Sequence, residues 1–159
     1  MVTEKNYQTI IEAKIKEAKS RAAPKRDWVK LSITLLDSSI QYRMETSERF
    51  VFIEIILMSV KFGPVAGLIS DNDCRAMPHD FLAHEAHCSI EEFESALEKA
   101  KADDSIFENG HGIFLTHFDD YQFTEYDRQK PYREAKKLAQ GRPAEKDYKG
   151  GRYGHMVKD

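Results

Sequence analysis

Apolar positions along the chain fall into stretches with either a helical or a strand-like period. Residues 6–21 place apolar side chains at helical spacing and lysines on the other sides, which predicts an amphipathic helix. Residues 28–36 alternate between apolar and polar positions, which predicts a strand with one buried face. Residues 47–62 are apolar almost all round, so we expect the central helix of the core there, ended by Gly63-Pro64.

Two further helices are predicted within residues 77–116. The pattern favours a short helix over 78–86, a tight break, and a second helix over 89–101. Ser89 and Glu92 have the spacing of a capping box, in which each side chain bonds to the backbone N–H of the other residue. The start of the second helix is therefore well defined by the sequence.

A hairpin follows the second helix. Asn109-Gly110 is the dipeptide that favours a two-residue type I′ turn with positive φ at both positions, so residues 106–107 can pair with 113–115. Residues 67–70 form a short apolar run that can join this hairpin as a third strand. The order of helix, turn, helix and hairpin is that of a winged helix-turn-helix.

The predicted fold class is therefore α+β: a winged helix-turn-helix, mostly helical with a small antiparallel sheet. An extra N-terminal helix and a basic C-terminal tail flank it. We divide the chain into an amphipathic helix (1–26), a winged-helix domain (27–125), a basic-aromatic helix (126–140) and a disordered tail (141–159).

Charge is distributed unevenly along the 159 residues, although the net charge is only −3. Residues 1–26 carry seven Lys and Arg against three Glu, and residues 128–159 carry ten against four Asp and Glu. Between them, residues 27–127 carry seven Lys and Arg against twenty Asp and Glu. Phosphate binding is therefore expected in the two basic arms rather than in the acidic body.

Composition indicates a cytoplasmic protein that does not enter the membrane. The longest apolar run, 50–60, is shorter than a membrane span and contains Glu54, and the polar N-terminus has no signal-peptide core. Cys74 and Cys88 form no Cys-x-x-Cys pattern, so we expect free thiols in a reducing compartment.

The histidines around residue 84 suggest zinc but do not complete a known site. His84-Glu85-Ala86-His87-Cys88 is close to the zinc-protease motif His-Glu-x-x-His, but Cys88 stands where the second histidine is required. His79 could add a ligand, but four convergent ligands are not evident in the sequence. We expect no catalytic residues, no metal and no cofactor, and a non-enzymatic protein.

The second helix of the central unit is a poor candidate for reading DNA. Its outward face carries three glutamates, which phosphates repel: Glu91, Glu94 and Glu98. The side chains on this helix that could reach bases or phosphates are only Ser95, Lys99 and Lys101.

The segment 119–138 is a better candidate, because its cations can neutralise phosphates while its tyrosines stack on bases. Pro131 is expected to interrupt any single long helix across it. The alternative is a solvated helix whose tyrosines pack on the body. The DNA-binding candidates of this segment are Arg128, Lys130, Tyr132, Arg133, Lys136 and Lys137.

Several motifs between residues 27 and 135 together resemble one protein family. They are Trp28-Val29-Lys30-Leu31, the apolar helix at 48–62, Gly67-Leu68-Ile69, the capped helix from Ser89, Ile113-Phe114-Leu115, Tyr121-Gln122 and the run 126–133. This set resembles the N-terminal winged-helix domain of phage replisome organisers, which are relatives of the DnaD-type replication initiation proteins. The resemblance implies a non-enzymatic, phage-related DNA-replication protein that self-associates.

Two functions remain open at this point. The first is DNA binding through the basic arms by a homodimer or higher oligomer, in replication initiation or its regulation, with a replication protein or another protein as partner. The second is a protein-binding adaptor or DNA-mimic inhibitor that acts through the acidic winged-helix body.

Overall fold

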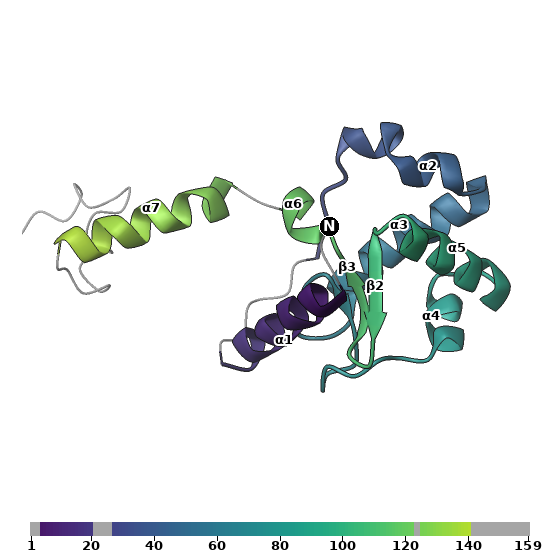
Figure 1. The fold of residues 1–159 in the computed structure, drawn as a ribbon, viewed down its shortest axis with the longest axis horizontal. Helices are drawn as coiled ribbons and strands as arrows, with labels where there is room; N and C mark the ends of the chain where they lie inside the picture. The colour runs from purple at the N-terminus through teal and green to yellow at the C-terminus, as the bar shows by residue number, and fades with distance from the viewer. Residues whose placement is uncertain (1–3, 21–26, 123–124, 141–159) are drawn as a thin grey trace, which may run out of the picture. The chain divides into compact units, whose positions relative to one another are not determined.

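The computed structural model describes residues 4–20, 27–122 and 125–140, and the chain divides into two units, Met1–Gln122 and Phe123–Asp159 (Figure 1). The helices of the first unit are α1 (Glu4–Ser20), the 3₁₀-helix η1 (Ile33–Asp37), α2 (Ser39–Arg43), α3 (Thr46–Lys61), α4 (His79–Glu85), α5 (Ile90–Ala102) and α6 (Phe118–Gln122). Its strands are β1 (Leu68–Ile69), β2 (Ile106–Asn109) and β3 (Gly112–Leu115). The second unit contains α7 (Glu125–Gln140).

The predicted α+β class is confirmed: the described chain is mostly helical and has a three-stranded antiparallel sheet in the order β1-β3-β2. The expected hairpin pairs Ile106 with Leu115 and Phe107 with Phe114. The expected third strand is also present, because β1 pairs with β3. None of the helices in the described ranges is long and apolar enough to cross a membrane.

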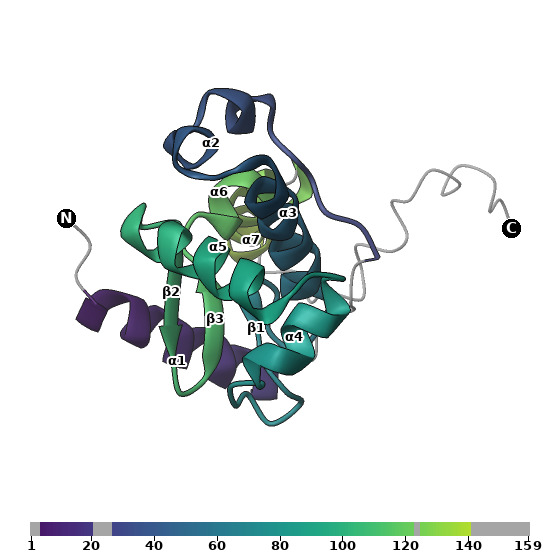
Figure 2. The same ribbon diagram turned by 90° about the vertical axis from the view of Figure 1, so that its right-hand side faces the viewer.

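Alternation along the short strands gives the sheet two buried faces. Ile69 and Ile113 pack with α3, α4 and α5 on one face. Their neighbours Leu68 and Phe114 pack on the other face, where they form an apolar cluster with Ile11 and other residues of α1. Figures 1 and 2 show α1 and α5 on opposite sides of the strands. The N-terminal helix is therefore part of the core of this unit, because it covers a sheet face that would otherwise expose apolar side chains.

The break before α5 and the start of α5 follow the sequence prediction. Helix α4 ends at Glu85, and His87 adopts a positive φ of 56°. The Ser89 hydroxyl accepts from the Glu92 N–H at 3.2 Å, and the Glu92 carboxylate accepts from the Ser89 N–H at 3.3 Å. The capping box is confirmed, and it fixes the direction in which α5 leaves the turn.

The predicted strand at 28–36 is wrong. Residues 28–32 have no regular secondary structure and residues 33–37 form η1, so we refer to residues 28–37 as the strap. The Ser32 hydroxyl accepts from the Thr34 N–H and starts the 3₁₀-helix. A period of two produces a strand only where a partner strand lies alongside. Here the backbone of Lys30 instead bonds to the side chain of Gln122, and Ile33 is 83% exposed.

The hairpin turn also differs from the expected type I′ turn. Asn109 pairs with Gly112, so the two loop residues are Gly110 and His111. Neither loop residue has a positive φ. The positive φ is instead at Gly112, which has a φ of 130°. The Asn109 side chain accepts from the His111 N–H at 2.9 Å. This Asx bond stabilises an alternative loop that needs only one left-handed residue.

Pro131 does not end a helix, contrary to expectation: it lies inside α7. Proline removes one backbone donor and crowds the preceding turn, but the helix continues on both sides of it. Helix α6 ends at Gln122 and α7 begins at Glu125. The tail at 141–159, which we expected to be disordered, lies outside the described residues.

Gly112→Ala should destabilise the protein because a Cβ at this position would lie 2.0 Å from the Ile69 carbonyl oxygen, at a φ of 130°. The expected loss is at least about 1–3 kcal/mol of unfolding free energy in urea titrations. Gly110→Ala is the matched control, since a Cβ there meets nothing within 4 Å. An equal loss in both variants would contradict this account of the turn.

Candidate functional site

The sequence-predicted base contact Lys99 points into the protein. Its ammonium group donates to Glu48 Oε2 at 2.6 Å, and Ser95 Oγ donates to Glu48 Oε1 at 2.6 Å. The Glu45 N–H also donates to Glu48 Oε2, at 2.8 Å. Two of the three polar side chains considered for base reading on α5 are therefore bonded to α3.

Glu48 is a buried carboxylate at the first turn of α3, with 7% of its surface exposed. Burial by itself would raise the pKa of Glu48, but hydrogen bonds from Lys99, Ser95 and the backbone of Glu45 outweigh it, and the pKa lies below its ordinary value. The carboxylate stays charged at neutral pH and joins α3 to α5. The negative charge near the N-terminus of α3 is also favourable to the helix dipole.

Lys101 is held in a second polar cluster, between α5, α4 and the hairpin. Its ammonium group lies 2.7 Å from Glu108 Oε1, and His79 Nε2 lies 2.6 Å from Glu108 Oε2. Burial acts to raise the pKa of Glu108, but the bonds from Lys101 and His79 lower it below its ordinary value. Lys101, like Lys99, is paired with a carboxylate of its own unit.

The outward face of α5 is acidic, as the sequence predicted. Glu91, Glu94 and Glu98 are exposed, and Glu92 beside them is exposed as well. With Lys99 and Lys101 paired to carboxylates, this face carries a net negative charge. It would repel the phosphates that line a DNA groove.

Three of the five cations of helix α7 share one helical face. Lys130, Arg133 and Lys137 follow one another at intervals of three and four, which places them on one helical face. Tyr132, which is 72% exposed, lies beside Lys136 one turn later. Among the described side chains of this helix only Arg133 is half-buried, and the rest are exposed. Arg128 belongs to α7, and its side chain lies outside the described part.

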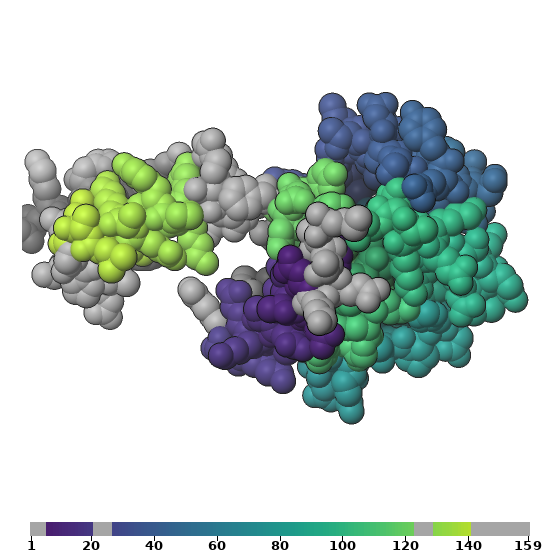
Figure 3. All heavy atoms as spheres, viewed as in Figure 1, coloured from purple at the N-terminus to yellow at the C-terminus, as the bar shows by residue number. Residues whose placement is uncertain are grey.

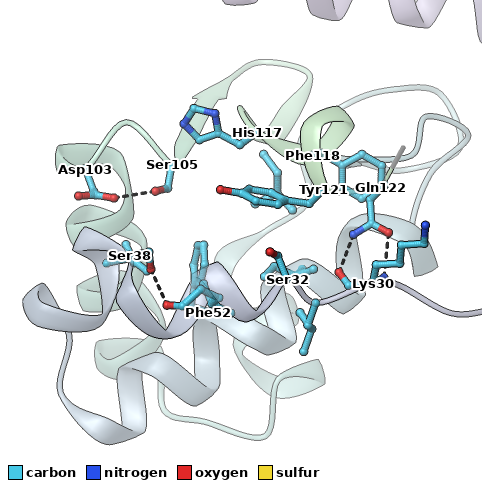
Figure 4. Close-up of a pocket in the computed structure, with 15 residues that line it drawn as sticks. Lys30, Ser32, Ser38, Phe52, Asp103, Ser105, His117, Phe118, Tyr121 and Gln122 are labelled. Atoms are coloured by element: carbon cyan, nitrogen blue, oxygen red, sulfur yellow. Dashed lines mark hydrogen bonds between the residues drawn. The ribbon is translucent and has the colours of Figure 1, made fainter. Parts of the chain in front are cut away.

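The first unit contains an apolar groove of about 100 Å³. In Figure 4 the rings of Tyr121 and Phe52 lie on facing sides, with Asp103, Ser105 and His117 gathered at one end. The groove is lined by Lys30, Leu31, Ser32, Leu35, Ser38, Ile40, Phe52, Ile56, Asp103, Ser105, Leu115, His117, Phe118, Tyr121 and Gln122.

Gln122 holds the strap against α6 and so forms one side of the groove. Its side-chain oxygen accepts from the Lys30 N–H at 2.9 Å, and its side-chain amide donates to the Lys30 carbonyl at 2.8 Å. Gln122 is buried, so this pair replaces the two bonds that a neighbouring strand would supply. Two apolar residues of the strap, Leu31 and Leu35, line the groove.

The polar end of the groove is internally bonded. Asp103 Oδ2 accepts from the Ser105 hydroxyl at 2.8 Å, and Asp103 Oδ1 lies 3.2 Å from Arg43 Nε of α2. Figure 3 shows η1 and α2, in blue, as a lobe at the surface of the unit. The pair Arg43–Asp103 thus ties this lobe to the end of α5.

The histidines considered for zinc do not come together. His79 bonds to Glu108, His84 and His87 are exposed, and the Cys88 thiol donates to the Ala83 carbonyl at 3.7 Å. Within the ranges that the structure describes, no three His, Cys, Asp or Glu residues are arranged to hold a metal ion.

Sequence reasoning missed two residues that shape the candidate surfaces. The apolar pattern marks Glu48 only as part of a helix, although its position three residues after Glu45, at the start of that helix, is a spacing typical of capping boxes. Gln122 has no local signal, because its bonding partner lies 92 residues away in the sequence.

Comparisons of the chain with protein-family models, with curated proteins and with solved structures found no match.

Lys99→Met should destabilise the protein by about 1–3 kcal/mol, because it keeps the aliphatic stem but removes the cation from the buried Glu48 carboxylate. Urea unfolding at about pH 7 measures the loss. Lys61→Met is the matched control: it breaks an ion pair with Glu85 in which the lysine side chain is 64% exposed, and it should cost less than about 1 kcal/mol.

The pH dependence gives a second readout of the same pair. Because the pKa of folded Glu48 is lowered, its contribution is complete above the ordinary carboxyl pKa and is lost as the pH falls through the folded value. The stability difference between wild type and Lys99→Met should therefore shrink in acid. A difference that stays constant down to about pH 3 would contradict the assignment.

Proposed function

We propose that this chain is a non-enzymatic winged-helix protein that binds DNA through the basic face of α7, in DNA replication initiation or its regulation. The observation that carries the proposal is the contrast between two helices. On α5 the lysines are bonded to buried or half-buried carboxylates, whereas on α7 the exposed side chains of Lys130 and Lys137 share one face. Phosphate binding needs cations that are not already neutralised by their own protein.

The arrangement of the first unit supports the winged-helix interpretation. Helices α4 and α5, joined by the turn at His87, are followed directly by the hairpin β2–β3, and β1 completes a small sheet. In this interpretation α5 takes the position of a recognition helix. Its exposed glutamates make it unsuited to a DNA groove, so the body acts as a scaffold and α7 supplies the phosphate contacts.

The second candidate function is that of a protein-binding adaptor, and the groove beside the strap favours it. Leu31, Ile33 and Leu36 are at least half exposed, which is unusual for three large apolar side chains so close in sequence. Such a surface is typical of protein contacts, either with another protein or with a second copy of the chain. A homodimer is compatible with DNA binding through α7.

Removing three positive charges from α7 tests the first function. The triple variant Lys130→Gln, Arg133→Gln, Lys137→Gln should weaken DNA binding strongly at about 50 mM salt. Each phosphate contact that is lost lowers the number of counterions released from the DNA on binding. The slope of log affinity against log salt should fall by about 2–3 for duplex DNA. Fluorescence anisotropy with duplex and single-stranded oligonucleotides measures both quantities.

The matched control removes the same charge from other parts of the chain: Lys16→Gln, Lys61→Gln, Arg75→Gln. It should bind DNA nearly as tightly as wild type if α7 supplies the contacts. Equal weakening in the two triple variants would show a non-specific charge effect. Absence of DNA binding by wild type at low salt would leave the adaptor function.

Replacing apolar residues of the strap tests self-association. Ile33→Ser with Leu36→Ser should shift a dimer toward monomer, because these side chains are 83% and 74% exposed in the single chain and their burial would drive association. Light scattering during size-exclusion chromatography measures the mass. Wild type that is monomeric at high concentration, or a double variant that remains dimeric, would contradict dimerisation through the strap.

A further inference from the structure

The groove between the strap, α3 and α6 has the size of a receptor for one side chain. Its volume of about 100 Å³ is somewhat below that of cavities which accept a benzene ring, about 150 Å³. Phe52 and Tyr121 lie on facing sides, so an inserted apolar group would contact aromatic rings on both sides. The groove therefore suits one branched aliphatic side chain rather than a whole aromatic ring.

Two residues that line the groove are also about half exposed to solvent. Leu31 is 51% exposed and Tyr121 is 48% exposed, although both line the groove. Apolar surface that remains in water at the edge of a cavity gains free energy when a partner covers it. The Gln122 bonds to the Lys30 backbone hold the strap in place beside α6, so little ordering would be required on binding.

The charge around the groove selects the kind of partner. Residues 27–122 carry seven Lys and Arg against eighteen Asp and Glu. In α6, next to the lining residues Phe118 and Tyr121, Asp119 and Asp120 have side chains that are 67% and 73% exposed. Lys14 pairs with Asp119, His117 Nδ1 lies 3.4 Å from Asp120 Oδ2, and Lys30 lines the groove. These contacts offset part of the local negative charge, but the balance of residues 27–122 remains acidic. A nucleic acid would be repelled by this unit, whereas a basic peptide would be attracted.

We propose that the groove is a docking site for a basic peptide segment of a partner protein, in which one bulky apolar side chain enters between Tyr121 and Phe52 and flanking Lys or Arg residues lie near the acidic residues of α6. None of the residues that line this groove belongs to α7. The inference develops the adaptor function and does not depend on DNA binding.

The probe for the experiment is a set of short synthetic peptides with one central Leu, flanked either by lysines or by glutamates. The full chain, labelled with ¹³C at methyl and aromatic groups, is titrated with each peptide and followed by NMR. Lysine-flanked peptides should shift the signals of Ile56, Leu115 and Tyr121. Higher salt should weaken the binding of these peptides. Glutamate-flanked peptides should bind less tightly.

Substitutions at the exposed edge of the groove distinguish binding in the groove from non-specific hydrophobic binding. Leu31→Ser and Tyr121→Ser should each weaken the lysine-flanked peptides roughly tenfold or more, which corresponds to the loss of one buried apolar contact. The matched controls are Leu57→Ser and Tyr42→Ser, because both residues are exposed and do not line the groove. The controls should bind as wild type does.

Three results would overturn the proposal. They are peptides that leave the groove signals unshifted, glutamate-flanked peptides that bind as tightly, and control variants that weaken binding as much as the groove variants. Groove signals that move on dilution of the protein alone would instead identify a second copy as the occupant. The result is distinguishable from the DNA function, since groove variants should retain DNA binding and the α7 triple variant should retain peptide binding.

Discussion

The buried carboxylate of Glu48 is the constraint on which the arrangement of α3 and α5 depends. Three donors from three residues converge on it, and one of them, Lys99, comes from the helix that would read DNA in a winged-helix protein. A buried charge is tolerated only when such donors neutralise it. The cluster therefore fixes the rotation of α5 about its own axis, with its lysine turned inward and its glutamates turned outward.

The rotation of α5 determines where the protein can meet an anion. Lys101 is bonded to Glu108 of the hairpin, so neither lysine at the C-terminal end of α5 is available to compensate the glutamates. The first unit thus remains acidic on this helix, whereas Lys130 and Lys137 of α7 have exposed side chains on one helical face. Of the two basic arms, the C-terminal one lies in the second unit, whereas the N-terminal one belongs to the first unit together with the acidic body.

Local signals predicted most of the fold. The capping box at Ser89, the helical spacing of apolar residues in α5 and the apolar run of β3 act over a few residues, and each is satisfied by contacts within or next to its own element. The strand prediction for the strap was wrong because a strand forms only beside a partner strand, and the sequence pattern does not specify that partner. The prediction of a type I′ turn at Gly110 was wrong because the Asn109 side chain bonds to the backbone and competes with the geometry that Asn-Gly favours.

The candidate groove could not be predicted for the same physical reason that the strand prediction failed. Had residues 28–36 joined the sheet, their alternating side chains would have been buried against it. Instead, Gln122 satisfies one peptide unit of the strap, and Leu31 is left half exposed beside Phe52 and Tyr121. A single side chain, distant in sequence, therefore converts a strand-like pattern into one side of an apolar groove. Sequence periodicity reports that such residues need apolar contact, but not whether this chain or a partner provides it.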